Sequence, residues 1–333
     1  MNRTKTTLAL AAALGIPATL HAQLAPPPAA ARTLTIATLA PVGSTWMRGF
    51  EAWNRELRRR SNGALALRFY PNGVQGDEGE VVRKIRARRL DGAALTGVGL
   101  AEIHRPVLVF QAPGLFEGYA QLDHARDALR PELDAAFERA GFTLLGWGDA
   151  GMDRVFSTHA VLSPADFSHT HPFQWREDLV AGPMFEELHA RGVPMQVPEV
   201  LTSLQTHTLD TIVTSPIAVA SLQWAAHLSH MTELIVAPEI GAVVFGHAQL
   251  ESLSPEHRAL LRETATQYTG LMVRNVRRDD DNTIGPLRQR GMTVDTPSAA
   301  QRSEWHAAFT RTRARLVGTL ADAAFFQRVE HAR

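Results

Sequence analysis

The most informative absence in this sequence is cysteine, because none of its 333 residues is one. A disulfide framework is therefore excluded, and so is a lipid-bearing cysteine that would tether the chain to a membrane. The fold must be stabilised by its hydrophobic core instead. With 45% hydrophobic and 20% charged residues, the composition is typical of a soluble globular protein with one large domain or two medium ones.

Short catalytic motifs are also absent. The sequence contains no G-x-S-x-G, no Walker loop and no G-x-G-x-x-G after a predicted strand, so nucleophilic hydrolysis, phosphoryl transfer and dinucleotide binding have no motif to support them. Gly97-Val98-Gly99 follows a predicted strand but lacks the third glycine. We therefore predict that the protein is not an enzyme and that it needs no cofactor.

Histidines are present, 14 in all, but not in a metal-binding pattern. His169 with His171, and the i, i+3 pair His227 and His230, are the candidate ligands, yet no cysteine or E-x-x-H motif completes either set. We expect no metal site. The acidic run at residues 279–281 falls within a long predicted helix, where we expect it to form a solvent-exposed turn.

Neither sign of charge dominates. The chain has 34 basic and 34 acidic residues and no long block of like charge, which argues against a nucleic-acid partner. Lysine is nearly missing, since only Lys5 and Lys84 occur, and arginine supplies the rest of the positive side chains. Any single arginine therefore carries little diagnostic weight.

The apolar run at the N-terminus, residues 7–20, is shorter than the roughly 20 residues that a membrane-spanning helix needs. Arg3 and Lys5 precede it, and Leu20-His21-Ala22 fits the signal-peptidase rule. We predict a signal peptide at residues 1–22, cleavage after Ala22, and a periplasmic protein without a stable membrane anchor. Residues 23–32, rich in proline and alanine, are predicted to be a linker.

A doubled pattern organises the rest of the chain. Residues 80–96 and 199–215 share apolar positions at i, i+1 and i+5, then Leu-Asp, then a β-prone run ending in Thr or Ser, at a constant offset of 119 residues (199 minus 80). Each copy predicts a helix followed by a strand. The offset is too long for a solenoid repeat and suits one α/β lobe, so two lobes of related build are expected.

Local patterns place further elements along the chain. Ser44 is a plausible N-cap for a helix whose apolar face includes Trp53 and Leu57, and residues 255–290 carry one long helical pattern that could reach across both lobes. We predict lobe I at residues 33–151 plus 241–280 and lobe II at 152–240 plus 281–333. Strands are expected at 33–39, 65–70, 92–97, 142–147 and 241–246, with another at 292–296.

Aromatic and hydrogen-bonding residues recur at the C-terminal ends of predicted strands, where open α/β sheets bind their ligands. Each one could be ordinary packing, but a cleft between two lobes explains the group better. The residues are Thr96, Trp147, Trp175, Arg176, Thr214 and Ser215.

Several longer segments, taken in order, resemble one known family. They are Thr38–Ser44, Tyr70–Glu78, Ile85–Ala93, Pro113–Phe116, Ser163–Phe167 and Glu199–Pro216. Over residues 33–316 the chain is similar to the solute-binding proteins of TRAP (tripartite ATP-independent periplasmic) transporters, the DctP-type family. The resemblance implies a two-lobed, type II-like periplasmic binding protein fold, with a long helix spanning both lobes around a ligand cleft. It also implies a small, usually carboxylate-bearing organic solute that is delivered to a membrane permease.

The chain departs from the family pattern in three places. Arg88 and His207 stand where the family commonly has glycine before the Leu-Asp step, so a left-handed residue there would be mildly strained. The usual K-I-R segment is missing, and Trp175 with Asp178 instead resembles a subgroup that has a Trp-rich segment and an Asp here. A frequent Asn is replaced by Thr214-Ser215.

A carboxylate in a closing cleft needs a cation with two aligned donors, which arginine supplies. Arg176 and Arg154 are the candidates, although Arg176 could pair with Glu177 or Asp178 and Arg154 with Asp153. Trp175 would supply an apolar wall, and Thr96, Thr214 and Ser215 would supply hydroxyl groups; Trp147 and Asp178 complete the predicted site. Two other classes stay open: an exported enzyme or metal-handling protein on a similar frame, and a binding protein that serves another importer or a sensor.

Overall fold

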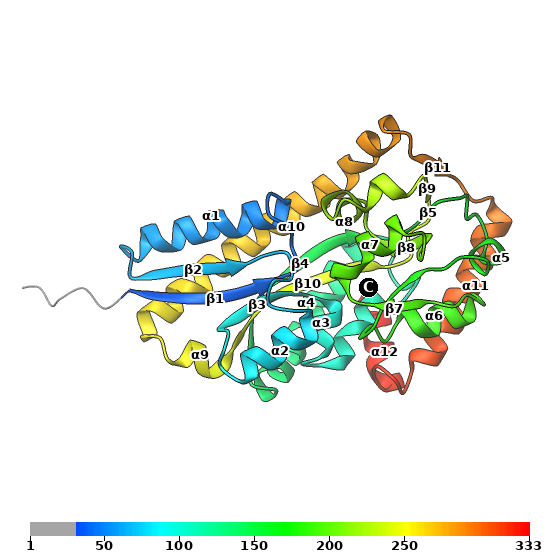
Figure 1. Cartoon of the computed structure of the whole chain (residues 1–333). Coiled ribbons are helices and arrows are strands. Elements are labelled where there is room, and N and C mark those ends of the chain that lie inside the picture. Colours follow the sequence, from blue (N-terminus) through cyan, green and yellow to red (C-terminus); the bar gives the residue numbers. More distant parts are fainter. Residues whose placement is uncertain (1–30) are drawn as a thin grey trace, which may run out of the picture.

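The computed structural model describes residues 31–333 and places their strands in two main sheets (Figure 1). The predicted signal peptide and all but the end of the predicted linker lie outside the described residues. The first sheet has the order β2-β1-β3-β10-β4 and the second has the order β11-β9-β5-β8. The fold is therefore two-lobed and mixed α/β, as the sequence predicted.

The first sheet combines a parallel half and an antiparallel half. β1 (Arg32–Thr38) pairs in parallel with β2 (Leu65–Tyr70) and β3 (Gly92–Thr96). β10 (Pro238–Gly246) then lies antiparallel to both β3 and β4 (Phe142–Met152), which confirms the predicted return strand.

The first helix of the first lobe begins where its capping residue predicts. Ser44 accepts a hydrogen bond from Met47 N and caps α1 (Thr45–Arg60), whose apolar face is buried. The remaining elements are α2 (Glu78–Arg86), α3 (Gly97–Ala101), η1 (Arg105–Gln111), α4 (Tyr119–Arg139) and α9 (His247–Glu251).

The second sheet is smaller. β5 (Arg154–Ser157) lies antiparallel to β8 (Thr211–Thr214) and to β9 (His230–Thr232), and β9 pairs in parallel with β11 (Thr293–Asp295). A separate parallel pair is formed by β6 (Phe173–Trp175) and β7 (Val193–Met195). Around them lie α5 (Pro164–Phe167), α6 (Ala181–Glu187), η2 (Val197–Glu199), α7 (Val200–Gln205), α8 (Pro216–Ser221) and η3 (Trp224–His227).

The doubled pattern of the sequence is present as α2 followed by β3 and α7 followed by β8. Arg88 and His207 have φ angles of 58° and 56°, so both adopt the left-handed conformation at the corresponding turn. The aspartates that follow act alike: Asp91 accepts a hydrogen bond from a neighbouring backbone N–H at 2.7 Å, and Asp210 does so at 2.8 Å. The second copy thus repeats both the helix-to-strand order and its anchoring bond.

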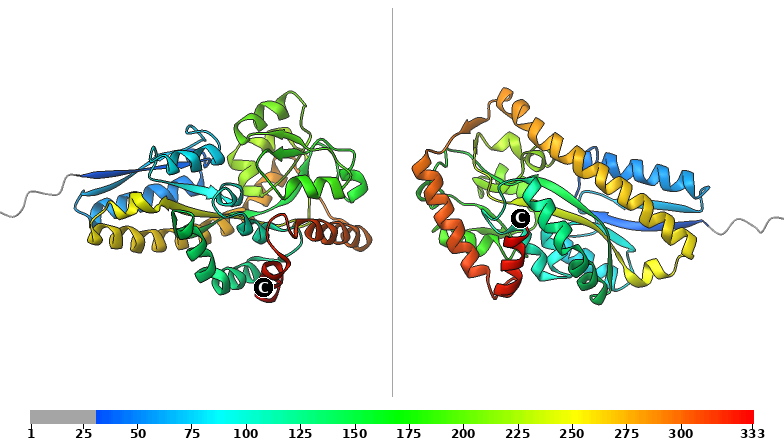
Figure 2. Two further views of the ribbon diagram at one scale, coloured as in Figure 1. Left: turned by 90° about the horizontal axis from the view of Figure 1, so that it is seen from below. Right: turned by 180° about the vertical axis from the view of Figure 1, so that it is seen from behind.

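The lobes are joined by β4 running on into β5, by β10 returning, and by the long helix α10 (Pro255–Gln289). Along its length α10 packs on α1 and β4 in the first lobe and on α8 in the second (Figure 2). This confirms the predicted helix that spans both lobes.

The acidic run inside α10 is only in part the solvent-exposed turn that we predicted, because Asp281 is exposed but Asp280 is not. Asp280 is fully buried, and its carboxylate accepts hydrogen bonds from Met152 N at 3.1 Å and Ile217 N at 2.9 Å. These donors lie at the end of β4 and at the start of α8. The burial is possible because backbone N–H groups satisfy the carboxylate.

The last two helices of the chain pack on different lobes. α11 (Ala299–Leu316) packs on α5 and α6 in the second lobe, whereas α12 (Ala323–His331) packs on α4 and η1 in the first. The predicted division, which assigns residues 281–333 to the second lobe, stays a prediction, but α12 does not pack where that division puts it. No helix among residues 31–333 is long and apolar enough to cross a membrane.

Candidate functional site

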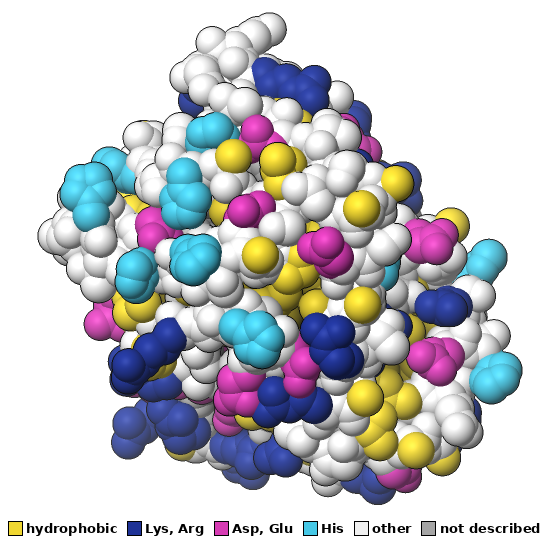
Figure 3. Space-filling model, turned by 90° about the vertical axis from the view of Figure 1, so that its right-hand side faces the viewer, with side chains coloured by type: hydrophobic (Ala, Val, Ile, Leu, Met, Phe, Trp, Pro, Cys, Tyr) yellow, Lys and Arg dark blue, Asp and Glu magenta, His cyan; other side chains and the backbone are white. Residues whose placement is uncertain are grey.

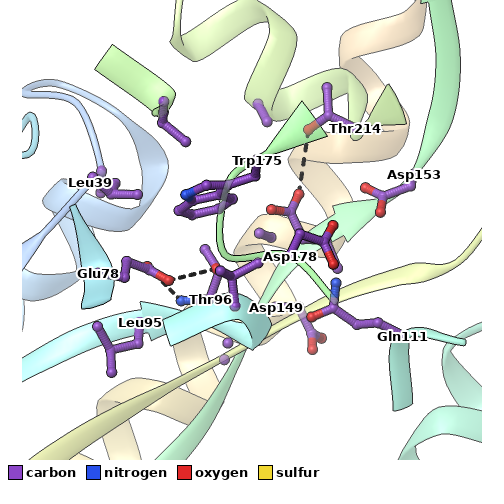
Figure 4. Close-up of a pocket in the computed structure, with 18 of the residues that line it drawn as sticks. Leu39, Glu78, Leu95, Thr96, Gln111, Asp149, Asp153, Trp175, Asp178 and Thr214 are labelled. Atoms are coloured by element: carbon purple, nitrogen blue, oxygen red, sulfur yellow. Dashed lines mark hydrogen bonds between the residues drawn. The ribbon is translucent and has the colours of Figure 1, made fainter. Parts of the chain in front are cut away.

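A cavity of about 200 Å³ lies between the two lobes, close to the C-terminal end of β3 (Figure 4). Its wall is largely aromatic and aliphatic, with a few polar side chains, which is the composition typical of small-molecule sites. The aromatic side chains are Trp46, Phe50, Trp147, Phe173, Trp175, Phe185 and Trp224.

Five of the eight predicted site residues line this cavity: Thr96, Trp147, Trp175, Asp178 and Thr214. Thr96, Trp175 and Thr214 stand at strand ends, as predicted. Trp147 does not, because β4 runs on to Met152, and Asp178 lies in the loop after β6.

The other three predicted site residues lie outside the cavity wall. Ser215 is fully buried and caps α8 by accepting from Ala218 N, while its hydroxyl donates to Ala150 O. Arg154 donates to Met152 O at 3.0 Å and lies 3.9 Å from a carboxylate oxygen of Asp280. Arg176 is exposed to solvent. A ligand role for these three stays a prediction.

Acidic side chains take the place that arginine was expected to fill. Within residues 31–333, the cavity wall includes no arginine, lysine or histidine. It includes five carboxylic acids, of which the sequence analysis identified only one: Glu78, Asp149, Asp153, Asp178 and Glu239. They divide into three groups by their partners.

Glu78 is satisfied by the protein itself. Its carboxylate accepts from Thr96 N, Thr96 Oγ1 and Gly99 N, each at 2.8 Å (Figure 4). Burial nevertheless raises the pKa of Glu78 to about 7, against the opposing effect of these bonds. A Cβ atom on Gly99 would lie 2.6 Å from Glu78 Oε2, so this glycine allows a close approach to Glu78 and is not part of a nucleotide-binding motif.

Asp149 is permanently paired. Its side chain is 0% exposed and lies 2.8 Å from Arg126 and 2.6 Å from Arg277. Both arginines also bind Asp123, at 3.1 and 2.6 Å. The Arg126 guanidinium lies 5.7 Å from the centroid of the Trp147 ring, so this ion-pair network supports the cavity wall from behind.

Asp153, Asp178 and Glu239, which we call the acidic cluster, have no ion pair among the described residues. Burial raises the pKa of all three, and it raises that of Glu239 to about 8 together with repulsion from Glu78, Asp280 and Asp178. Asp178 accepts from Val180 N at 2.7 Å, and Glu239 accepts from Thr214 Oγ1 at 3.5 Å. Asp178 and Glu239 therefore each have a hydrogen-bond partner, but none of the three acids has an ion pair in the described chain.

Three buried polar atoms of the wall have neither a hydrogen-bond partner nor an ion pair in the described chain. They are Trp147 Nε1, Gln111 Oε1 and Asp153 Oδ1. Unpartnered buried polar groups are rare in folded proteins and need a specific explanation. Their gathering around one cavity is explained by a polar ligand that satisfies them.

Trp175 connects the two lobes across the cavity. Its ring lines the cavity from the second lobe, and its Nε1 donates to Asp77 Oδ2 at 3.0 Å. Asp77 is the N-cap of α2 in the first lobe. This hydrogen bond therefore joins the two lobes at the cavity wall.

Two of the four candidate metal-binding histidines have other partners. His171 and His230 lie 3.0 and 2.8 Å from Asp210 and Asp295. Several histidines occur on the second-lobe end of the molecule, separated by other side chains (Figure 3). Within residues 31–333, no group of three potential ligands is placed to hold a metal ion.

A cavity between two α/β lobes, with unpartnered polar groups in its wall, is the arrangement expected of a two-lobed solute-binding protein. Residues 36–317 match the family described as bacterial extracellular solute-binding protein, family 7, and the chain belongs to that family. The resemblance seen in the sequence is therefore confirmed, and the family is one of binding proteins rather than enzymes.

Individual relatives are distant in sequence. The chain is 24% identical over 250 residues to the 2,3-diketo-L-gulonate-binding periplasmic protein YiaO of Escherichia coli, covering 73% of this chain and 75% of YiaO. A TRAP periplasmic solute-binding protein of Shewanella oneidensis with bound succinate has a TM-score of 0.86 at 17% identity, with 91% and 99% of the two chains covered. The sugar acid binding protein of Advenella mimigardefordensis in complex with galactonate also has a TM-score of 0.86, at 14% identity, with 92% and 100% covered. At such identities the structures show a shared fold.

Proposed function

We propose that this chain is the extracytoplasmic receptor of a TRAP permease, that it binds a small carboxylate-bearing organic solute in the cavity, and that it delivers the solute to the membrane subunits. The observation that carries the proposal is the enclosed interlobe cavity with its three unpartnered polar atoms. Family membership supports the transport role, and the succinate and galactonate bound by structural relatives support the solute class.

For the solute carboxylate, the wall offers neutral donors. The Trp147 Nε1–H has no partner in the protein, and the side-chain amide of Gln111 faces the same space (Figure 4). Arg154 is the arginine next to the cavity-lining Asp153, but it would have to give up Met152 O to reach a ligand. Trp175 supplies the apolar wall, and Thr96 and Thr214 supply hydroxyl groups.

A thermal-shift screen over organic acids, sugar acids and amino acids tests the proposal. A true ligand at 100 times its dissociation constant adds about 2.7 kcal/mol to the free energy of unfolding. Calorimetric titration of the best compound should then show at least a tenfold weaker affinity for Trp147→Phe, which keeps the ring but removes the N–H donor. If no compound in the screen stabilises the protein, the receptor function is wrong.

The transport setting can be tested separately. We propose that residues 1–22 are removed on export, so mass spectrometry of the periplasmic protein should give a chain that begins at Gln23. An intact Met1 would contradict this. For the permease partner, genes for a small and a large membrane subunit should lie beside this gene.

A further inference from the structure

The acidic cluster has a composition that a carboxylate solute alone does not explain. Its three carboxylic acids come from separate segments: Asp153 from the junction of β4 and β5, Asp178 from the loop after β6, and Glu239 from β10. All three line the cavity, and Figure 4 shows Asp153 and Asp178 beside it. A binding site for an anion would place positive side chains here, yet within the described residues the wall has none.

The surroundings do not neutralise the cluster. Arg154 is the nearby cation, and its guanidinium is bound to Met152 O and lies 3.9 Å from Asp280, a further buried acid. A buried carboxylate without a counter-charge is strongly unfavourable, and several close together repel one another. Protonation relieves this cost in the ligand-free protein, and a positive charge supplied by a solute would take the place of those protons.

The shape of the site favours an organic cation over a metal ion. A metal ion needs three or more oxygen ligands converging within about 2.0–2.6 Å, and no group of three acidic or histidine side chains in residues 31–333 is placed for that. An ammonium group instead carries up to three divergent N–H donors and can bridge carboxylates on different walls. The rings of Trp175 and Trp224 also bound the cavity, and aromatic rings attract organic cations.

We propose that the solute carries a cationic nitrogen, an ammonium or alkylammonium group, which binds between Asp153, Asp178 and Glu239. This rests on the proposed function and makes the solute a zwitterion, in which Trp147 Nε1 and Gln111 Nε2 donate hydrogen bonds to the carboxylate, while Gln111 Oε1 remains an acceptor for other groups of the solute. The chemical class is that of amino acids, whose ammonium group donates to the acids, and of betaines, whose quaternary nitrogen has no N–H and would be held by charge and by the aromatic rings, rather than simple organic acids or sugar acids.

Matched pairs of compounds that differ only in the nitrogen test this. The purified full-length mature protein is titrated by calorimetry with amino acids and betaines, and with the hydroxy acids and simple acids of the same carbon skeletons. The best amino compound should bind at least roughly 30-fold more tightly than its deaminated counterpart, as expected when a charge-assisted hydrogen bond is lost. Glu239→Gln and Asp178→Asn should each weaken that compound roughly 10- to 100-fold. Glu256→Gln, at an exposed position on α10, is the matched control and should leave binding unchanged.

Each outcome separates the two proposals. If deaminated acids bind as well as amino compounds, and both cavity variants retain or improve affinity, the cationic nitrogen is wrong while the receptor function stands. If a simple acid binds only with added calcium or sodium, a metal ion bridges the cluster and the ammonium assignment is overturned. If neither amino nor deaminated compounds stabilise the protein, the receptor function fails as well. Circular dichroism of both variants checks that they are folded.

Discussion

Asp149 and Asp153 lie on the same chain segment and line the same cavity, but their surroundings are opposite. Asp149 is held by two arginines that approach from α4 and α10, whereas Asp153 has an unpartnered oxygen and no ion pair among the described residues. The same strand region therefore contains one buried carboxylate that is paired with arginines, Asp149, and one that is not, Asp153. The difference indicates that the charge of Asp149 serves the fold and that of the acidic cluster is reserved for a ligand.

Removing an arginine that pairs with Asp149 should lower the free energy of unfolding more than any other change proposed here. Arg277→Ala removes one of two partners of Asp149 and the main partner of Asp123, and loss of one member of a buried pair costs about 3–5 kcal/mol. Because the Arg277 side chain is 18% exposed, we expect about 3 kcal/mol, measured by urea unfolding. Arg311→Ala removes a surface pair with Glu187 and should cost less than about 1 kcal/mol. Equal losses in the two variants would contradict the structural role of Asp149.

Asp280 is a third kind of buried carboxylate, satisfied by backbone N–H groups. Asp280→Ala leaves the N–H groups of Met152 and Ile217 unsatisfied, and each orphaned donor costs about 1–3 kcal/mol. We expect a loss of about 2–3 kcal/mol in the same assay. Asp280→Asn keeps one acceptor oxygen and should lose less. Equal losses for the Ala and Asn variants would show that charge, not hydrogen bonding, fixes this residue.

Removing a charge from the acidic cluster should raise the free energy of unfolding instead of lowering it. The pKa of Glu239 is raised to about 8 in the folded protein, so its stabilising contribution is fully present below about pH 4.5 and is lost as pH rises through 8. Glu78, with a pKa raised to about 7, acts in the same direction, and the facing acids Asp178 and Asp280 add repulsion. Ligand-free protein should therefore be less stable at pH 8.5 than at pH 5.

Glu239→Gln should flatten that profile and raise the free energy of unfolding at pH 8.5 by about 1–2 kcal/mol. Thermal unfolding of both proteins across this range measures it. For the parent protein, an ammonium ligand must displace bound protons, so its affinity should increase from pH 6 to pH 8.5. If the free energy of unfolding of the variant falls with pH as steeply as that of the parent, the charge of Glu239 does not destabilise the folded protein.

The smallest effect concerns backbone strain rather than charge. A non-glycine residue in the left-handed conformation destabilises the folded state by about 1–2 kcal/mol. Glycine removes this strain but loses more conformational entropy on folding, which costs about 0.5–1 kcal/mol. Arg88→Gly, at a φ of 58°, should therefore stabilise the protein by about 0.5 kcal/mol, equally at pH 5 and pH 8.5. It serves as the reference in which no charge in the cavity changes. A pH-dependent gain would show that Arg88 interacts with the titrating groups.

The sequence predicted those parts of the fold that depend on local patterns. Ser44 caps α1, the two Leu-Asp turns repeat, and the long apolar periodicity of α10 is one helix, because neighbours in sequence decide each of these. Site residues at strand ends, such as Thr96 and Thr214, were predictable for the same reason.

The acidic part of the site was not predictable, because a charged residue in a sequence is normally solvated. Glu239 precedes a recognisable strand, but only tertiary packing buries it beside Asp153 and Asp178. Asp149 and Arg277 are separated by 128 residues, and no local signal joins them. With arginine this abundant, sequence alone also could not separate the arginines that stabilise the wall from those that might contact a ligand.

The bonds that Asp280 makes have a consequence for exchange with solvent. The amide hydrogens of Met152 and Ile217 belong to different segments, the end of β4 and the start of α8, yet both are held by one carboxylate on α10. Their exchange for deuterium requires α10 to move away from the strands that join the lobes. We expect the two hydrogens to exchange at the same slow rate. That rate would report how often α10 separates from the lobes, without a ligand or an attached probe. Independent rates at the two sites would show that the segments detach one at a time.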